Sequence, residues 1–265
     1  MTMYENTCIF CRKVFSRKGK RNQKYCSVSC GSQNKNTDIN IFSEINDISA
    51  YILGFIFADG NLSIYLDEKS NKMRRYLTIS SSDEDLSREI HKLITPNKKL
   101  YIYLSKGTGL CKNSKIKIGY NIKTCQEDII NSIIELGVSP RKSNSMTFPN
   151  LDKKFIGSFI RGYFDGDGTV GFMNIKSGNK IHNYLKIKFT SGSILFLEEL
   201  AFILNSFEIK TDISQDKRSN AFYLCSQDKK SIKRFYNLIY STDGISLKRK
   251  KERFENFYSA SPVIF

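Results

Sequence analysis

The sequence predicts an α+β fold built from two related halves, each with the element order helix, strand, strand, helix, strand, strand, helix (αββαββα). The stretch YILGFIFADG (51–60) returns as FIRGYFDGDG (159–168), at an offset of 108 residues. The same offset places YLTIS (76–80) on YLKIK (184–188), so the similarity extends beyond a single motif. A repeat kept at nearly constant spacing indicates duplication, and two copies predict a pseudo-twofold single chain.

Each half is expected to begin with a buried helix, over residues 47–58 and 152–165. The first helix is apolar nearly all round, which is typical of a helix inside a core, and Asp47 can serve as its N-cap. On each helix, two small residues four positions apart leave a strip along which two backbones can approach closely. We therefore expect the two helices to pack on each other. The small residues are Gly54, Ala58, Gly162 and Gly166.

The remainder of each half alternates between apolar and polar residues, as expected for antiparallel strands with one face on helices and one face in water. The first predicted strand, LSIYLD (62–67), places Leu62 and Ser63 on opposite faces and continues this alternation to its end. Further strands are predicted at 75–80, 99–104, 114–121, 209–214 and 220–226, and further helices at 83–94, 124–136, 193–205 and 229–240.

The first 35 residues differ from the rest of the chain because they contain four cysteines and few aliphatic residues. We predict a four-cysteine module at 1–35, a linker at 36–46, a first repeat at 47–150 and a second repeat at 151–265.

The composition favours a soluble protein that binds a polyanion. The 265 residues include 42 Lys and Arg against 26 Asp and Glu, a formal charge of +16, and such an excess is typical of nucleic-acid partners. An AT-rich coding bias, which inflates the lysine content, is the alternative explanation. No apolar run is long enough for a membrane span, and the N-terminus lacks the pattern of a secretory signal. We expect an intracellular protein, in an organelle, a phage-infected cell or a bacterium.

Both opening helices end in Asp-Gly, at Asp59 and Asp167. A carboxylate at the negative end of a helix dipole is unfavourable, and two such groups brought together also repel each other. A divalent cation would relieve both effects. Two carboxylates with the neighbouring carbonyl groups of Ala58 and Gly166 form a hard oxygen site suited to Mg²⁺, which can activate water beside a phosphate.

The stretches ILGFIFADG (52–60) and IRGYFDGDG (160–168) resemble the nine-residue motif of the LAGLIDADG homing endonucleases, in their single-chain two-repeat form. The resemblance implies two saddle-shaped antiparallel sheets around a central pair of motif helices. It also implies cleavage of double-stranded DNA at long target sites, with metal bound by the last acid of each motif. The earlier acid of the motif is Phe57 in the first copy and Asp165 in the second, where a structural role is expected.

The same family places a basic residue near each scissile phosphate, just before the closing helix. The candidates are Lys123 in the first copy and Lys230, or its neighbour Lys229, in the second. Solvated lysines are the alternative interpretation, because lysine is abundant in this chain. Ser81 and Ser191, at the ends of strands, are candidates for positioning a water molecule.

Two-stranded β elements fit the major groove of DNA, so the polar strand face predicts the residues that contact DNA. The strand alternation selects Ser63, Tyr65, Arg74, Tyr76, Thr78, Tyr101 and Tyr103 in the first copy, and Met173, His182, Tyr184, Lys186 and Lys188 in the second.

The N-terminal cysteines occur as two pairs, Cys8 with Cys11 and Cys26 with Cys30. Four cysteines at this spacing suit tetrahedral structural zinc. A segment this small has too little apolar core to fold without a bound metal or a similar cross-link. The segment resembles small treble-clef or zinc-ribbon modules. Its basic loop (16–24) is expected to contact DNA phosphates, and unmetallated thiols or a protein-docking module are the alternatives.

The leading hypothesis is a monomeric, magnesium-dependent homing endonuclease for double-stranded DNA, with structural zinc at its N-terminus. The alternative is a non-cleaving binder of the same fold, such as an intron RNA maturase. A pure binder has no need for both Asp59 and Asp167. We do not expect a protein-splicing element, because residue 1 is no splicing nucleophile and the chain does not end in His-Asn.

Overall fold

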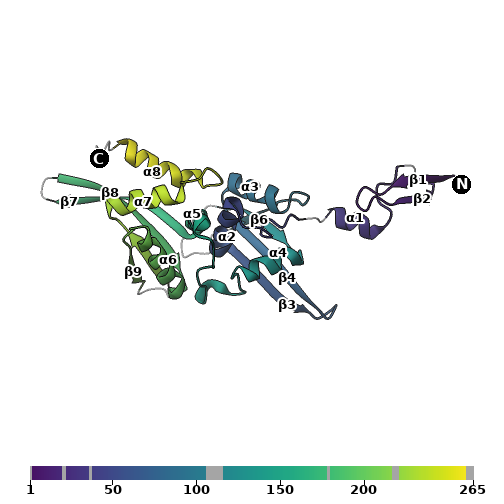
Figure 1. Ribbon diagram of the computed structural model, residues 1–265, viewed down its shortest axis with the longest axis horizontal. Helices are drawn as coiled ribbons and strands as arrows, with labels where there is room; N and C mark the ends of the chain where they lie inside the picture. The colour runs from purple at the N-terminus through teal and green to yellow at the C-terminus, as the bar shows by residue number, and fades with distance from the viewer. Residues whose placement is uncertain are drawn as a thin grey trace.

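Two four-stranded antiparallel sheets with their helices lie side by side, and a small N-terminal module lies at one end of the molecule (Figure 1). This computed structural model describes residues 2–19, 22–35, 38–105, 116–177, 180–216 and 221–260. The predicted α+β class and the two αββαββα repeats are confirmed. Within these ranges, none of the helices combines the length and the apolar character that crossing a membrane requires.

The first repeat forms a sheet with the strand order β3-β4-β6-β5. Its elements are α2 (Asp47–Asp59), β3 (Gly60–Asp67), β4 (Lys72–Ser81), α3 (Glu84–Ile94), β5 (Tyr101–Ser105), β6 (Lys117–Thr124), α4 (Glu127–Glu135) and the 3₁₀ turn η1 (Lys142–Asn144).

The second repeat forms a sheet with the equivalent order β7-β8-β10-β9. Its elements are η2 (Lys153–Phe155), α5 (Ile156–Asp167), β7 (Gly168–Ser177), β8 (Lys180–Ser191), α6 (Ile194–Ser206), β9 (Asp212–Gln215), β10 (Phe222–Ser226), α7 (Lys229–Ile239) and α8 (Lys248–Ala260).

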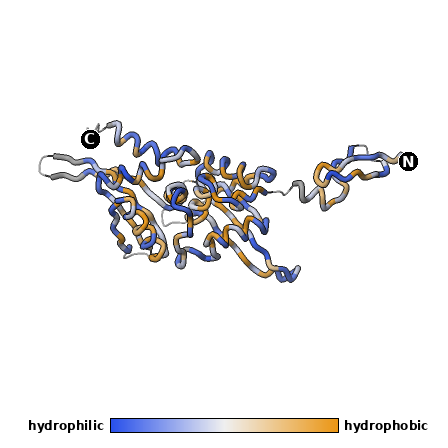
Figure 2. The backbone as a smooth tube through the Cα atoms, in the orientation of Figure 1, coloured by the Kyte–Doolittle hydropathy of each residue, from blue (hydrophilic) through white to orange (hydrophobic). Residues whose placement is uncertain are grey.

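Each sheet has one apolar face against helices and one polar face. In the first repeat Leu62, Leu77 and Ile122 are buried against the helices, and their strand neighbours point the opposite way because side chains alternate along a strand. The tip of the hairpin between β3 and β4 is hydrophilic (Figure 2). On the polar face of the first sheet the side chains of Tyr65, Tyr101 and Tyr103 are exposed.

The two motif helices, α2 and α5, pack against each other at the predicted small residues. A Cβ on Gly54 would overlap the carbonyl oxygen of Phe159, and a Cβ on Gly162 would overlap that of Tyr51. A side chain at either position would force the helices apart, so the close approach depends on glycine.

The start of α2 differs from the prediction. Asn46, and not Asp47, is the N-cap: its side-chain oxygen accepts hydrogen bonds from the amides of Ile48 and Ser49, and the Ser49 hydroxyl accepts one from the Asn46 amide. This is a reciprocal capping box. Asp47 instead accepts a hydrogen bond from the Ser158 hydroxyl at 2.5 Å, which ties α2 to α5.

Two further segments differ from the sequence prediction. The stretch expected to be a linker packs on the first repeat from residue 38 onward, because the buried Asp38 carboxylate accepts hydrogen bonds from Lys98 and Thr124 and Phe42 lies in the core. Residues 36 and 37 lie outside the described residues. The helix α8 was not predicted; it buries Phe254 and Phe257 against the second repeat.

The N-terminal module consists of a β-hairpin followed by a short helix. Strands β1 (Met3–Thr7) and β2 (Val14–Lys18) pair antiparallel, and α1 (Val28–Lys35) follows them. Residues 20 and 21 of the predicted basic loop lie outside the described residues.

Candidate functional site

The two motif helices end side by side, which places Asp59 and Asp167 at the same point of the molecule. Gly166 permits this approach, because a Cβ on Gly166 would overlap Cβ of Ala58 and lie 3.0 Å from Oδ2 of Asp59. In both repeats the chain leaves the motif helix through a glycine with extended backbone, Gly60 after α2 and Gly168 after α5. It then continues directly into β3 and β7. The acids therefore lie where the helix pair meets the two sheets.

Burial raises the pKa of Asp59 from 3.8 to about 6, and the charge on Asp167 adds to this increase. Burial also raises the pKa of Asp167, while the ammonium groups of Lys142 and Lys250 oppose the change. In both cases the surroundings disfavour the carboxylate form. The pair is thus electrostatically strained in the way expected of a site that holds a cation.

Two buried lysines, Lys142 and Lys250, supply the positive charge next to the acid pair. Lys142 donates a hydrogen bond from Nζ to the carbonyl oxygen of Ala58 at 3.3 Å. Lys250 donates to the carbonyl oxygens of Phe164, at 2.6 Å, and of two further residues at the end of α5. Burial lowers the pKa of both ammonium groups, that of Lys250 to about 8.

These two lysines were not predicted from the sequence, although the repeat contains a signal for them. Lys142 and Lys250 are separated by 108 residues, as are Asp59 and Asp167. The lysines predicted from the sequence have different surroundings. The ammonium group of Lys123, on β6, lies 5.3 Å from the centre of the Tyr101 ring. Lys229 and Lys230 are exposed in the first turn of α7, and neither Lys123 nor Lys230 is among the charges that act on the two acids.

The earlier acid of the second motif, Asp165, anchors the loop that leads to Lys250. Its Oδ2 accepts hydrogen bonds from the Leu247 amide at 2.7 Å and from the Tyr51 hydroxyl at 2.8 Å. Its counterpart in the first motif, Phe57, is buried and packs edge-to-face on Phe159, with the ring centres 5.2 Å apart. The two equivalent positions thus join the repeats by different chemistry, and the structural role expected for Asp165 has a physical basis.

Ser81 and Ser191, proposed to position water, occupy equivalent local structures. The Ser81 hydroxyl accepts a hydrogen bond from the Asp83 amide at 3.1 Å, and the Ser191 hydroxyl accepts one from the Ser193 amide at 3.0 Å. Each hydroxyl therefore helps to start the following helix. Ser81 also lines a pocket of about 320 Å³ next to Asp59.

The residues selected for DNA contact share one face of each sheet. In the first sheet the pairings of Ser63 with Tyr76, and of Tyr65 with Arg74, fix this face, and the residues Thr78, Lys123, Tyr101 and Tyr103 follow on the same side. In the second sheet the pairings of Met173 with Tyr184 and of residue 175 with His182 place them on one face, together with Lys186 and Lys188. The side chain of His182 lies outside the described residues. Contact of this face with DNA stays a prediction.

The donor set beside the helix ends fits a hard divalent cation. It combines two partly buried carboxylates with raised pKa values and the adjoining carbonyl groups of Ala58 and Gly166, and Mg²⁺ prefers oxygen ligands of this kind. Ala58 already accepts a hydrogen bond from Lys142. Asp59 and Asp167 are therefore the residues that would hold the ion.

The four cysteines of the N-terminal module form a second candidate metal centre. Cys8 and Cys11 lie in the turn between β1 and β2, Cys26 lies just before α1, and Cys30 lies in the first turn of α1. Their four Sγ atoms lie within 4.8 Å of one another. Sγ of Cys26 is 3.5 Å from that of Cys11 and 3.4 Å from that of Cys30. Zinc bonded tetrahedrally at about 2.3 Å separates its sulfur ligands by about 3.8 Å, so the cluster has the size of a zinc site.

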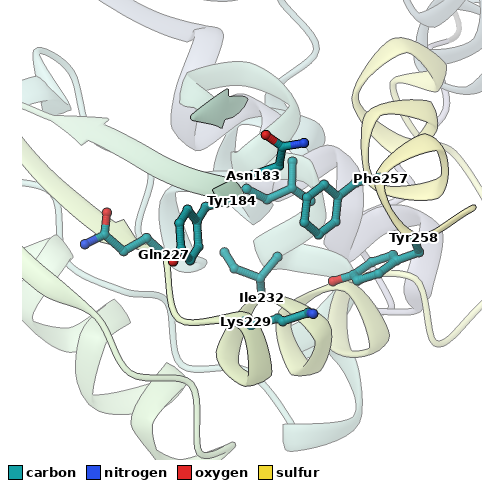
Figure 3. Close-up of a pocket in the computed structure, with 8 residues that line it drawn as sticks. Asn183, Tyr184, Gln227, Lys229, Ile232, Phe257 and Tyr258 are labelled. Atoms are coloured by element: carbon teal, nitrogen blue, oxygen red, sulfur yellow. The ribbon is translucent and has the colours of Figure 1, made fainter. Parts of the chain in front are cut away.

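A second pocket, of about 280 Å³, lies between β8, α7 and α8 (Figure 3). Ile232 and Phe257 form much of its wall, with Asn183 and Lys229 at its edge. Tyr184 is the single predicted DNA-contacting residue that lines it.

Comparison with known proteins places this site within a known fold. A family model described as a LAGLIDADG-like domain matches residues 154–240. The chain has the fold of the LAGLIDADG meganuclease I-AabMI bound to uncleaved DNA (TM-score 0.56, 14% identity, 82% of this chain and 91% of that chain). It also has the fold of I-SmaMI bound to an uncleaved DNA target in the presence of calcium ions (TM-score 0.51, 12% identity, 82% and 90%).

Curated relatives are much longer proteins. The chain is 27% identical over 214 residues to the DNA-directed RNA polymerase subunit Rpo1C of Methanocaldococcus jannaschii, covering 79% of this chain and 21% of that protein. It is 29% identical over 133 residues to a probable translation initiation factor IF-2 of the same organism, covering 46% and 10%. The chain thus spans about a fifth or less of the curated relatives it matches.

Proposed function

Because this chain has the two-repeat LAGLIDADG fold, we propose that it is a site-specific double-stranded DNA endonuclease that uses a divalent metal ion. The observation that carries this proposal is the meeting of Asp59 and Asp167 at the ends of α2 and α5. A protein that only binds nucleic acid has no use for two neighbouring, partly buried carboxylates, because their ionised forms are unfavourable in the folded protein. A nuclease needs them to hold a cation against a phosphate.

The two acids and the two buried lysines have different roles in the proposed hydrolysis. Asp59 and Asp167 would hold Mg²⁺, which would polarise the phosphate and make a water molecule more acidic. Lys142 and Lys250 keep the helix ends in place and add positive charge where negative charge develops in the transition state. In the hydrolysis an oxygen from water bonds to phosphorus, one ester bond breaks, and the departing oxygen takes up a proton.

The polar sheet faces provide the surface for the DNA. They carry basic and aromatic side chains, among them Arg74, Tyr76, Lys186 and Lys188, and β elements fit the major groove. The lysines would contact phosphates and set the register, whereas shorter polar side chains would read bases. Both halves of the catalytic site lie in one chain, so a monomer is sufficient for activity.

The N-terminal cysteine cluster is proposed to hold structural zinc. The four Sγ atoms are close enough to share one tetrahedral ion, and the module has little apolar core of its own. Zinc would then stabilise the hairpin and α1 and take no part in hydrolysis. Its basic residues would add affinity for DNA phosphates.

Selection for cleavage from a randomised DNA library in Mg²⁺ tests the nuclease proposal. The wild type should enrich a defined target, and the Asp59→Asn and Asp167→Asn variants should enrich none. Cleavage of the same target by both variants would refute the assignment of the acids. Failure of the wild type to cut any DNA, together with tight binding of intron RNA, would favour the maturase alternative.

A further inference from the structure

The pocket next to Asp59 is polar and contains one cation that the chemistry above does not use. The pocket, of about 320 Å³, is lined by Asp59, Ser80, Ser81, Ser82 and Arg249, together with Tyr103, Gly166, three apolar residues and Asp165. Oδ2 of Asp165 already accepts hydrogen bonds from the Leu247 amide and the Tyr51 hydroxyl. The serines come from the end of β4 in the first repeat and supply hydroxyl groups. Arg249 comes from the first turn of α8 in the second repeat. A pocket between a catalytic acid, hydroxyl groups and a guanidinium has the composition of a phosphate site.

Lys250 is the obvious alternative for binding a phosphate here, but its protons are already engaged. An ammonium group has three N–H donors. Lys250 donates to the carbonyl oxygens of Phe164, Asp165 and Gly168, which are three acceptors. Its charge still acts at the site, but it has no donor left for a phosphate oxygen.

Arg249 has the opposite properties. It precedes Lys250 directly, so the buried lysine fixes the backbone that carries it, while its own side chain is exposed. Among the residues that the structure describes, its guanidinium has no hydrogen-bond acceptor and no carboxylate partner. Arg249 lines the pocket, and the five N–H donors of its planar guanidinium are free to bind two oxygens of a phosphate.

We propose that Arg249 binds the DNA phosphate at the Asp59 end of the site, so that the second repeat supplies the phosphate-binding group for a pocket whose acid and hydroxyls come from the first. This proposal rests on the proposed nuclease function. Arg249 then contacts only one of the two strands to be cut, because Asp59 and Asp167 belong to different repeats. The alternative is that Arg249 is a solvated surface cation, which attracts DNA by its charge without contacting the strand to be cut.

Lys248 is the matched control for that alternative. It lies one residue away on the same helix turn, carries the same charge and is exposed, but it does not line the pocket. Loss of general attraction to DNA would affect both positions alike. Loss of a phosphate contact would affect Arg249 alone.

The test uses the full chain, a supercoiled plasmid with the selected target, and Mg²⁺. Arg249→Ala should slow the cutting of one strand by about 100-fold, the effect of removing one donor to a developing oxyanion, so that nicked circular DNA accumulates. Arg249→Lys should restore part of the rate, and Lys248→Ala should yield linear DNA as the wild type does. DNA binding with Ca²⁺ in place of Mg²⁺, and the melting temperature, should change little in all three variants.

Linear product from Arg249→Ala at the wild-type rate would overturn the inference while leaving the nuclease function intact. Equal slowing of both strands, shared by Lys248→Ala, would also overturn it in favour of general attraction. A wild type that cuts no DNA, while binding it, would refute the nuclease function and this inference with it.

Discussion

Replacing Asp59 by asparagine should stabilise the metal-free protein at neutral pH while removing its activity. The substitution keeps the shape of the side chain and removes a charge that the folded protein disfavours. Burial and the charge on Asp167 raise the pKa of Asp59 from 3.8 to about 6. At about 1.4 kcal/mol for each tenfold change, ionising this group costs about 3 kcal/mol more in the folded protein than in the unfolded chain.

The sign of the pH dependence follows from the raised pKa. A group with a raised pKa favours the fold fully below its unfolded value of 3.8, and this contribution is lost as the pH rises through about 6. Wild type and Asp59→Asn should therefore be equally stable near pH 4. Above pH 7 the variant should be more stable by up to about 3 kcal/mol. This figure already includes the attraction of the Asp59 carboxylate for Lys250 and Lys142, because both lysines contribute to its pKa.

Urea unfolding with EDTA at several pH values between 4 and 8 measures this difference. The control is Asp243→Asn, the same chemical change at an exposed position, which should give a small difference that does not follow pH in this way. Adding Mg²⁺ at pH 8 should stabilise the wild type more than Asp59→Asn. A variant that is less stable than the wild type at pH 8, or a difference that stays constant from pH 4 to pH 8, would refute the electrostatic argument.

Three further predictions concern the helix interface, the lysines and the zinc module. Gly162→Ala forces a Cβ onto the Tyr51 carbonyl oxygen and should destabilise the protein by about 2 kcal/mol or more in urea unfolding; Gly171→Ala, at a position with open space, should change it by less than about 0.5 kcal/mol, and equal effects would contradict the packing argument. Lys142→Met should lower the cleavage rate by about 100-fold, whereas Lys230→Met should leave it unchanged, and the reverse result would restore the lysine chosen from the sequence. Cys26→Ser should lose the zinc that elemental analysis finds in the wild type, and equal zinc in both proteins would refute the four-cysteine site.

The fold could be predicted in detail because its signals are local and occur twice. The offset of 108 residues aligned the motif helices, and strand alternation selected residues that do share one sheet face, such as Tyr65 and Tyr76. Both signals depend on the chemistry of neighbouring residues. Neither requires knowledge of long-range contacts.

The features that were missed depend on tertiary contacts. Lys142 and Lys250 lie outside the long predicted helices, and their role depends on carbonyl groups 82 or more residues away. The helix α8 is strongly polar apart from residues such as Phe254 and Phe257, so its apolar stripe was too narrow to predict a buried face. Asn46 is the N-cap of α2, whereas Asp47 accepts a hydrogen bond from Ser158 on the partner helix, a contact that the sequence does not reveal.

We propose that each repeat contributes one acid to a single metal-dependent site. The most direct test of this proposal is cleavage of the selected target in Mg²⁺ by the wild type and by the Asp59→Asn, Asp167→Asn and double variants, with DNA binding measured in parallel. We predict that all three variants bind the target and that none produces a double-strand break. A double-strand break by either single variant, at a rate near that of the wild type, would contradict a site shared between the two repeats.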